Sequence, residues 1–234
     1  MTLVIGHKGA PILGPENTVA SFARARSLGI DGVELDVRRT GDDQLAVWHD
    51  PALADGRVLL DHRWDQLDGG VDGLEEVLDA CRGLDVVNVE IKNWPTDPDF
   101  DPDLGIADTV AATLAGRSPA ERESFVVSCF HLGTVDRVRE RLDVLAPEIR
   151  TGLLLWGVDD VTDVVTTVVE RRHGALHPHF TAVTAELLAE AHAAKLAVNT
   201  WTCNHLEDIR RLADLGTDGI ITDRPDEAKA ALAG

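Results

Sequence analysis

The chain has 234 residues, 44% of them hydrophobic, and carries a formal net charge of −19 at pH 7. This length is enough for one large domain over residues 1–234, and α/β barrels are often of this size. The strong negative charge repels nucleic acid and anionic lipid head groups, so we expect neither as a main partner, whereas divalent cations are attracted.

The amino terminus has no basic segment followed by a long apolar run, and no stretch approaches the length of a membrane span. The cysteines are Cys81, Cys129 and Cys203, an odd number with wide spacing, which argues against a disulfide frame or a zinc site. We therefore expect a cytoplasmic protein without a membrane span, whose cysteines pack as small apolar side chains.

Apolar, strand-like runs alternate along the chain with amphipathic, helix-like runs. The expected strands are 3–6, 33–37, 86–91, 125–130, 151–156, 175–177, 196–201 and 219–222. The expected helices are 17–28, 74–81, 106–114, 135–142, 161–171, 185–194, 206–215 and 225–232. Eight strand–helix units predict an α/β fold closed into a (β/α)8 TIM barrel. The alternative is an open doubly wound sheet, which the absence of a Gly-rich or Walker phosphate loop disfavours.

A further strand-like run, 45–48, follows the second strand after only a short polar turn. Because parallel neighbours need a crossover of a dozen or more residues, this run should fold back antiparallel as a short hairpin arm. Such an arm would bring His49 near the start of the second strand rather than its end, unless the arm bends or is longer. Residues 51–72 lack periodicity and are expected to form a surface loop.

Residues 32–37 read Gly-Val-Glu-Leu-Asp-Val, so apolar and acidic side chains alternate. A strand places alternate side chains on opposite faces, so Glu34 and Asp36 share one face, roughly 6.5–7 Å apart along the strand. If the apolar face is core, both carboxylates point into an enclosed space, where a hard cation relieves their repulsion. The alternative is an edge strand with a solvated acidic face.

In a barrel, side chains at the carboxyl ends of the strands converge on one mouth, where chemistry takes place. The residues at the expected strand ends are His7, Lys8, Glu34, Asp36, Glu90, Lys92, Ser128, His131, His177, His179, Trp201, Asn204, Asp223 and Arg224. Glu34, Asp36 and Glu90 offer only carboxylate oxygens, a donor set that selects Mg²⁺ or Ca²⁺ over zinc. We expect these three residues to hold one divalent cation.

Two histidines beside such a cluster would have a further use. One neutral and one protonated imidazole form a general base and a general acid near neutral pH, as cleavage of a phosphodiester requires. His7 directly follows an apolar strand, a position that also suits a structural histidine with a hydrogen bond. Lys8 and Lys92 would add local positive charge, although either can be a solvated lysine. We expect His131, His177 and His179 to be ordinary hydrogen-bonded or solvent-facing residues.

Seven short segments, spread from residue 7 to residue 225, carry a resemblance to a known family. They are His7-Lys8-Gly9, Pro15-Glu16-Asn17-Thr18, Gly32-Val33-Glu34-Leu35-Asp36-Val37, His49-Asp50, Glu90-Ile91-Lys92, Trp201-Thr202 and Asp218-Gly219-Ile220-Ile221-Thr222-Asp223-Arg224-Pro225. In this order the chain resembles the glycerophosphodiester phosphodiesterase family, of the phospholipase-C-like phosphodiesterase superfamily. The resemblance covers the whole chain.

The resemblance implies a (β/α)8 barrel with its site at the mouth. It implies a divalent cation, Mg²⁺ or Ca²⁺ with Mn²⁺ also possible, held by Glu34, Asp36 and Glu90. It also implies His7 and His49 as the catalytic acid–base pair, and thereby places His49 at the site. The substrate-binding residues that it implies are Lys92 near the phosphate, an aromatic contact from Trp201, and Lys8.

Two features depart from the family pattern. Lys8 stands where the family usually has arginine, so the positive charge is kept but the bidentate fork for phosphate is lost. The stretch between His49 and the helix at residue 74 is shorter than usual, so we expect a reduced insertion and a more open mouth.

The resulting hypothesis is metal-dependent hydrolysis of small glycerophosphodiesters to sn-glycerol 3-phosphate and an alcohol. One alternative is a lysophospholipase D-like activity, which an open mouth favours and an acidic surface disfavours. A second alternative is a non-catalytic barrel that binds a phosphate ligand. An isomerase or aldolase barrel is disfavoured because no strand-end lysine lies in an apolar setting.

Overall fold

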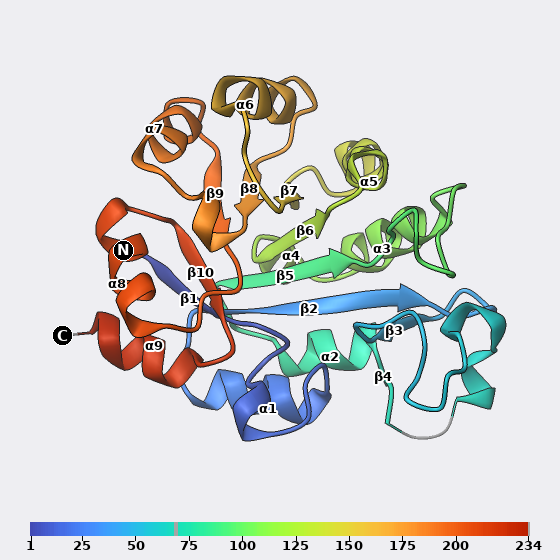
Figure 1. Cartoon of the computed structure of the whole chain (residues 1–234). Coiled ribbons are helices and arrows are strands. Elements are labelled where there is room, and N and C mark those ends of the chain that lie inside the picture. Colours follow the sequence, from blue (N-terminus) through green and yellow to red (C-terminus); the bar gives the residue numbers. More distant parts are fainter. Residues whose placement is uncertain (68–69, 234) are drawn as a thin grey trace.

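Eight parallel strands close into a barrel in the computed structural model, which describes residues 1–67 and 70–233 (Figure 1). They are β1 (Leu3–Gly6), β2 (Gly32–Arg39), β5 (Val86–Ile91), β6 (Phe125–Cys129), β7 (Arg150–Leu155), β8 (Ala175–Pro178), β9 (Ala197–Thr200) and β10 (Gly219–Thr222). The ring closes because β1 pairs in parallel with both β10 and β2. The predicted (β/α)8 barrel is confirmed, and the open sheet is excluded.

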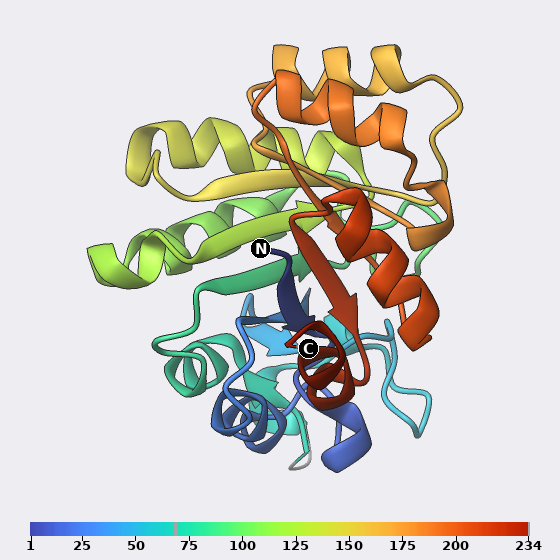
Figure 2. The same cartoon turned by 90° about the vertical axis from the view of Figure 1, so that its left-hand side faces the viewer.

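Helices surround the barrel, as the two perpendicular views show (Figures 1 and 2). They are α1 (Val19–Ser27), α2 (Leu74–Ala80), α3 (Gly105–Ala115), α4 (Pro119–Arg122), α5 (Leu132–Leu145), α6 (Val161–Glu170), α7 (Ala185–Ala193), α8 (Leu206–Leu215) and α9 (Pro225–Leu232). The expected helices are all present, and the short α4 was not predicted. Helix α1 begins later than expected, because the Thr18 hydroxyl accepts the amide hydrogen of Ser21 and caps it.

The hairpin arm pairs antiparallel with the end of β2, as predicted, but it does not carry His49 to the start of that strand. Strand β2 continues to Arg39, beyond the predicted end, and only residues 37–39 pair with β3 (Leu45–Val47). The amide of Trp48 then donates to the carbonyl of Asp36. Because the pairing ends there, His49 lies at the mouth of the barrel, where the family resemblance placed it.

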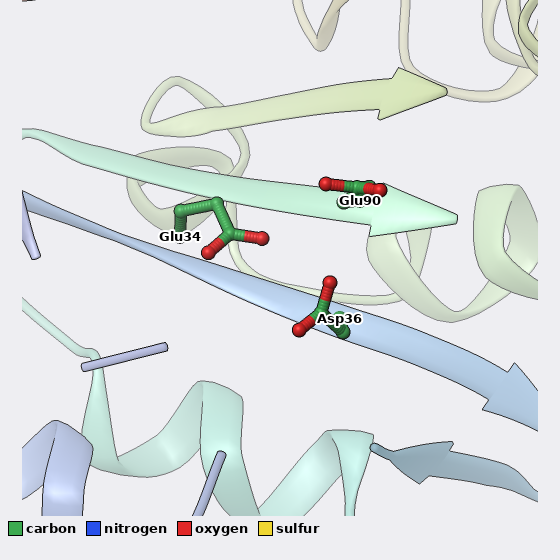
Figure 3. Close-up of side chains that lie close together, drawn as sticks. All are labelled: Glu34, Asp36 and Glu90. Atoms are coloured by element: carbon green, nitrogen blue, oxygen red, sulfur yellow. The ribbon is translucent and has the colours of Figure 1, made fainter. Parts of the chain in front are cut away.

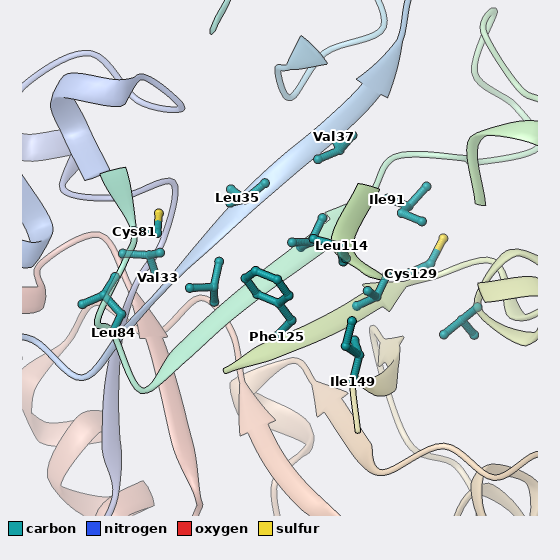
Figure 4. Close-up of a cluster of buried hydrophobic side chains, with 14 of the residues drawn as sticks. Val33, Leu35, Val37, Cys81, Leu84, Ile91, Leu114, Phe125, Cys129 and Ile149 are labelled. Carbon is teal, nitrogen blue, oxygen red and sulfur yellow. The ribbon is translucent and has the colours of Figure 1, made fainter. Parts of the chain in front are cut away.

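The main hydrophobic core lies between the barrel and its helices (Figure 4). On β2, the side chains of Val33, Leu35 and Val37 are fully buried in this core. Burial of each such side chain stabilises the fold by about 1.5–3 kcal/mol. Since β2 pairs with β1 on one side and β5 on the other, the alternative of a solvated edge strand is excluded. Glu34 and Asp36 therefore point into the barrel.

The expected surface loop at 51–72 is more ordered than predicted. It contains two 3-10 turns, η2 (Leu59–Asp61) and η3 (Trp64–Gln66), and ends in the short strand β4 (Asp72–Gly73), which pairs with β3. Residues 68 and 69 of this loop lie outside the described residues. The three cysteines are buried and free, as expected. Within 1–67 and 70–233, no helix has the length and apolar character needed to span a membrane.

Candidate active site

Three buried carboxylates meet inside the mouth of the barrel (Figure 3). Glu34 and Asp36 project from β2, and Glu90 projects from the neighbouring strand β5, where it is the register partner of Asp36. One oxygen from each residue lies within 4.8 Å of the others. Alternation along β2 and direct pairing with β5 thus bring together the cluster that the sequence predicted.

The charges of this cluster are not balanced by protein groups alone. Burial and the charges of Asp36 and Glu90 raise the pKa of Glu34 well above its ordinary value. Burial also opposes ionisation of Asp36, but Lys92 and the nearby histidines outweigh it and lower the pKa of Asp36. The buried Glu34 Oε1 has no hydrogen-bond partner among the described residues. An oxygen-only donor set with an unpartnered carboxylate oxygen fits a hard divalent cation.

Lys92 lies directly on the cluster. Its ammonium is 2.6 Å from Glu90 Oε1 and 3.4 Å from Asp36 Oδ1, and these carboxylates keep the lysine pKa above its ordinary value despite burial. Lys8 is placed differently, because its ammonium pairs with Glu16 Oε1 at 3.0 Å. The backbone amide of Lys8, which has a positive φ of 53°, donates to Glu34 Oε2.

His7 is held by an aspartate from the last strand–helix connection. Its Nδ1 lies 2.6 Å from Asp223 Oδ1, and Asp223 in turn accepts a hydrogen bond from Asn204 Nδ2 at 2.5 Å. A carboxylate can only accept, so Nδ1 donates and Nε2 is left to accept or give a proton. His7 Nε2 lies 3.9 Å from Glu34 Oε2 and so faces the carboxylate cluster.

The pKa of His7 reflects this setting. Burial of the ring lowers the pKa, but the hydrogen bond that Nδ1 donates to Asp223 and the charges of Glu34 and Asp36 outweigh burial, so the pKa lies above its ordinary value.

His49 has a similar arrangement, directly after the arm that pairs with the end of β2. Its Nδ1 lies 2.7 Å from Oδ1 of Asp50, the next residue in the chain, which leaves its Nε2 available. The His49 side chain is 42% exposed, so it can meet a substrate that enters from solvent. His7 and His49 are thus each oriented by an aspartate, and the structure brings both to the mouth that holds the three carboxylates.

Arg38 is a site residue that the sequence did not single out. Its side chain is 3% exposed, and its Nε donates to the carbonyl of His49 at 2.8 Å. The same guanidinium binds both carboxylate oxygens of Asp99 and one of Asp97. It therefore fixes the backbone at His49 against the β5–α3 loop. A charged residue after the carboxylates of β2 was the only hint in the sequence.

Asn17 directly precedes Thr18, the cap of α1, and contacts the carboxylate cluster. Its Nδ2 donates to Asp36 Oδ2 at 2.8 Å, and its Oδ1 accepts from the Asp36 amide at 3.3 Å. The positive φ of Asn17, 55°, is common for asparagine and lets the side chain turn back towards β2. Asn17 thus fixes the Asp36 carboxylate.

A pocket of about 390 Å³ opens beside the cluster, and its walls include His49, Glu90 and Lys92. Aromatic rings line its other side. Trp201 lies in contact with this aromatic group, and its indole nitrogen donates to the carbonyl of His177 at 2.7 Å. Trp201 therefore presents its ring, not its N–H, to the mouth.

The remaining strand-end histidines do not join the two catalytic candidates. His131 bonds Thr134 through Nδ1, and His179 bonds Thr181 in the same way. His177 is fully buried inside the barrel, and burial lowers the pKa of its imidazole to about 3. Asn199 Nδ2 lies 3.4 Å from His177 Nε2, so all three match the expectation of ordinary hydrogen-bonded or solvent-facing histidines.

The carboxylate cluster and the oriented histidines lie at the carboxyl ends of the strands of a parallel barrel, which is where the active site of a TIM-barrel enzyme lies. The chain matches the model of the Glycerophosphoryl diester phosphodiesterase family over residues 7–227. It therefore belongs to this family, whose members are phosphoric diester hydrolases. The predicted family is confirmed.

Similar proteins support this assignment. A glycerophosphodiester phosphodiesterase of Bacillus altitudinis is 29% identical over an alignment 254 positions long, which covers 97% of each chain. The solved structure of a putative glycerophosphoryl diester phosphodiesterase from Silicibacter pomeroyi has a TM-score of 0.84 and 28% identity, and covers 100% of this chain and 93% of that one. A phosphodiesterase from Oleispira antarctica, solved with the product sn-glycerol-3-phosphate, has the same fold, with a TM-score of 0.85, 22% identity, and coverage of 100% and 98%.

Proposed function

We propose that this protein hydrolyses small glycerophosphodiesters to sn-glycerol 3-phosphate and an alcohol, with a divalent cation and two histidines. One observation carries the proposal: two His–Asp pairs lie at the mouth that also holds three buried carboxylates. The product named for the Oleispira antarctica phosphodiesterase is the one expected here.

Glu34, Asp36 and Glu90 would hold the cation, Mg²⁺ or Ca²⁺, with Mn²⁺ as a further option. When bound, such a cation neutralises phosphate charge and makes the phosphorus a better electrophile. Lys92, which contacts two of these carboxylates, would contact a phosphate oxygen. Lys8 would add charge when its ammonium leaves Glu16, and the ring of Trp201 would border the substrate.

His7 and His49 would divide the proton transfers. In one step a neutral Nε2 takes the proton of the attacking oxygen, and the protonated Nε2 of the other ring gives a proton to the leaving alcohol as the P–O bond breaks. Asp223 and Asp50 hold the two rings in the required tautomer and orientation. The His7 side chain, 23% exposed, would meet the substrate from the barrel side, and the His49 side chain, 42% exposed, from the solvent side.

The test is release of glycerol 3-phosphate from glycerophosphocholine and glycerophosphoethanolamine, with EDTA, Mg²⁺, Ca²⁺ or Mn²⁺ in parallel. We expect release with at least one cation and none with EDTA. Folded protein that releases no product from either substrate with any cation would favour lysophospholipids as substrates first, and a non-catalytic phosphate-binding role second. Release that persists in EDTA would contradict the role of the cation.

A further inference from the structure

Four rings form an aromatic wall at the mouth: Trp94, Phe130, Trp156 and Trp201. Phe130 stacks on Trp156 with centroids 5.5 Å apart and meets Trp94 and Trp201 edge to face, at 6.0 and 5.3 Å. Trp156 also meets Trp201 edge to face at 4.7 Å. Rings at right angles to one another present faces in more than one direction, as in sites that enclose a cationic group.

The aromatic wall is open to ligand. Trp156 is 66% exposed and Trp94 is 43% exposed, and these are among the few large apolar side chains at the surface. Both line the 390 Å³ pocket together with His49, Glu90 and Lys92. A substrate whose phosphate lies at the carboxylate cluster would therefore place a neighbouring group against the wall.

The charges around this pocket favour a cationic group. Asp50 and Asp97 also line it; they bond to His49 and Arg38, respectively, and their carboxylates remain 72% and 26% exposed. Its permanent cations are both engaged, Arg38 by Asp97 and Asp99, and Lys92 by the cluster. The net charge of −19 adds to the attraction of a cation.

We propose that the aromatic wall is a subsite for a leaving alcohol with a quaternary ammonium group, of the choline type. This inference rests on the proposed function and names the class of alcohol released. The faces of Trp94 and Trp156 would contact the trimethylammonium group by cation–π interaction. The pocket must also hold the phosphate and glycerol groups, and this favours a small head group over an acyl chain.

The experiment compares kcat/KM for glycerophosphocholine and for its neutral isostere, in which 3,3-dimethylbutanol replaces choline. The two alcohols have the same shape, so their ratio isolates the positive charge. We expect the choline ester to be preferred about 5- to 30-fold. A ratio near one would overturn the inference, while hydrolysis of either ester would leave the proposed function intact.

Two variants test whether the aromatic wall causes the preference for the choline ester. Trp156→Leu and Trp94→Leu keep an apolar side chain but remove the ring, so each should move the ratio towards one. Trp64→Leu is the matched control, because Trp64 lines a separate pocket beside Leu45. Thermal unfolding checks that every variant is folded. If both variants keep the preference for the choline ester, another part of the site recognises the positive charge.

Lysophosphatidylcholine provides the remaining comparison. This lipid carries the same choline group and an added acyl chain. If the aromatic wall binds the acyl chain instead, the lipid should be hydrolysed faster than glycerophosphocholine, and Trp94→Leu and Trp156→Leu should keep that rate. That result would overturn the choline subsite in favour of a lysophospholipase D-like substrate. Absence of turnover with every ester would instead refute the proposed function, and the inference with it.

Discussion

The two sides of the barrel mouth are held together by different kinds of interaction. On the side of β1, β2, β5 and β10, buried charges are held by directed contacts, such as Arg38 with Asp99 and His7 with Asp223. On the side of β6, β7 and β9, aromatic rings such as Phe130 and Trp156 are held by contact area. Loss of one partner of a buried ion pair leaves an uncompensated charge, whereas loss of one ring from a wall removes only its own contact. The charged side should therefore be far less tolerant of substitution.

The largest effect is expected at the carboxylate cluster. Asp36→Asn removes one proposed ligand and breaks the contact with Lys92, so turnover should fall below detection and cation affinity should drop at least tenfold. Calorimetric titration with Ca²⁺ and Mn²⁺ measures the affinity independently of activity. Asp65→Asn, at an exposed carboxylate outside the mouth, is the control. Unchanged cation binding in Asp36→Asn would remove this residue from the cation site.

The histidines should come next. His7→Ala and His49→Ala each remove a proton-transfer group, which should lower kcat by about 10²–10⁴-fold while leaving the fold intact. Initial rates and circular dichroism measure the two properties. His192→Ala is the control, because His192 pairs with Asp218 away from the mouth. Near-full activity in His49→Ala would show that its pairing with Asp50 serves no proton transfer.

His177 tests the interior beneath the aromatic side. Burial lowers its pKa to about 3, so the unfolded chain, with a pKa near 6.5, binds a proton that the folded protein does not. The contribution of the neutral His177 ring to the free energy of unfolding is complete above pH 6.5 and is lost as the pH falls towards 3. Between pH 7 and 4.5 the free energy of unfolding should fall by about 2–3 kcal/mol more in the wild type than in His177→Gln. Urea unfolding at both pH values measures this difference, with the exposed His192→Gln as control. Equal losses in wild type and His177→Gln would mean that the ring is not held neutral.

A smaller effect is expected at Arg38. Arg38→Lys keeps the charge but cannot maintain the bonds to His49, Asp97 and Asp99 together. We expect kcat to fall about tenfold with little change in KM, because His49 is less well oriented while substrate contacts remain. Arg137→Lys, on the outer face of α5, is the matched control. An equal loss of kcat in both variants would indicate general destabilisation instead of a positioning role.

The sequence by itself determined the barrel and the carboxylate cluster. Strand–helix alternation predicts the number of parallel strands, and a period of two places Glu34 and Asp36 on one face of β2. The structure shows that this face points into the barrel and that Asp36 pairs with Glu90. Even the antiparallel arm was predictable, because its connection is too short for any other arrangement.

Only the tertiary structure decided how the site is completed. His7 and Asp223 are 216 positions apart, and Arg38 and Asp99 are 61 apart, so no local pattern links them. The place of His49 depended on how far β2 extends before the arm begins to pair. The aromatic wall likewise joins rings from separate strand ends. Local periodicity fixes which way a side chain faces, but closure of the barrel fixes which distant side chain it meets.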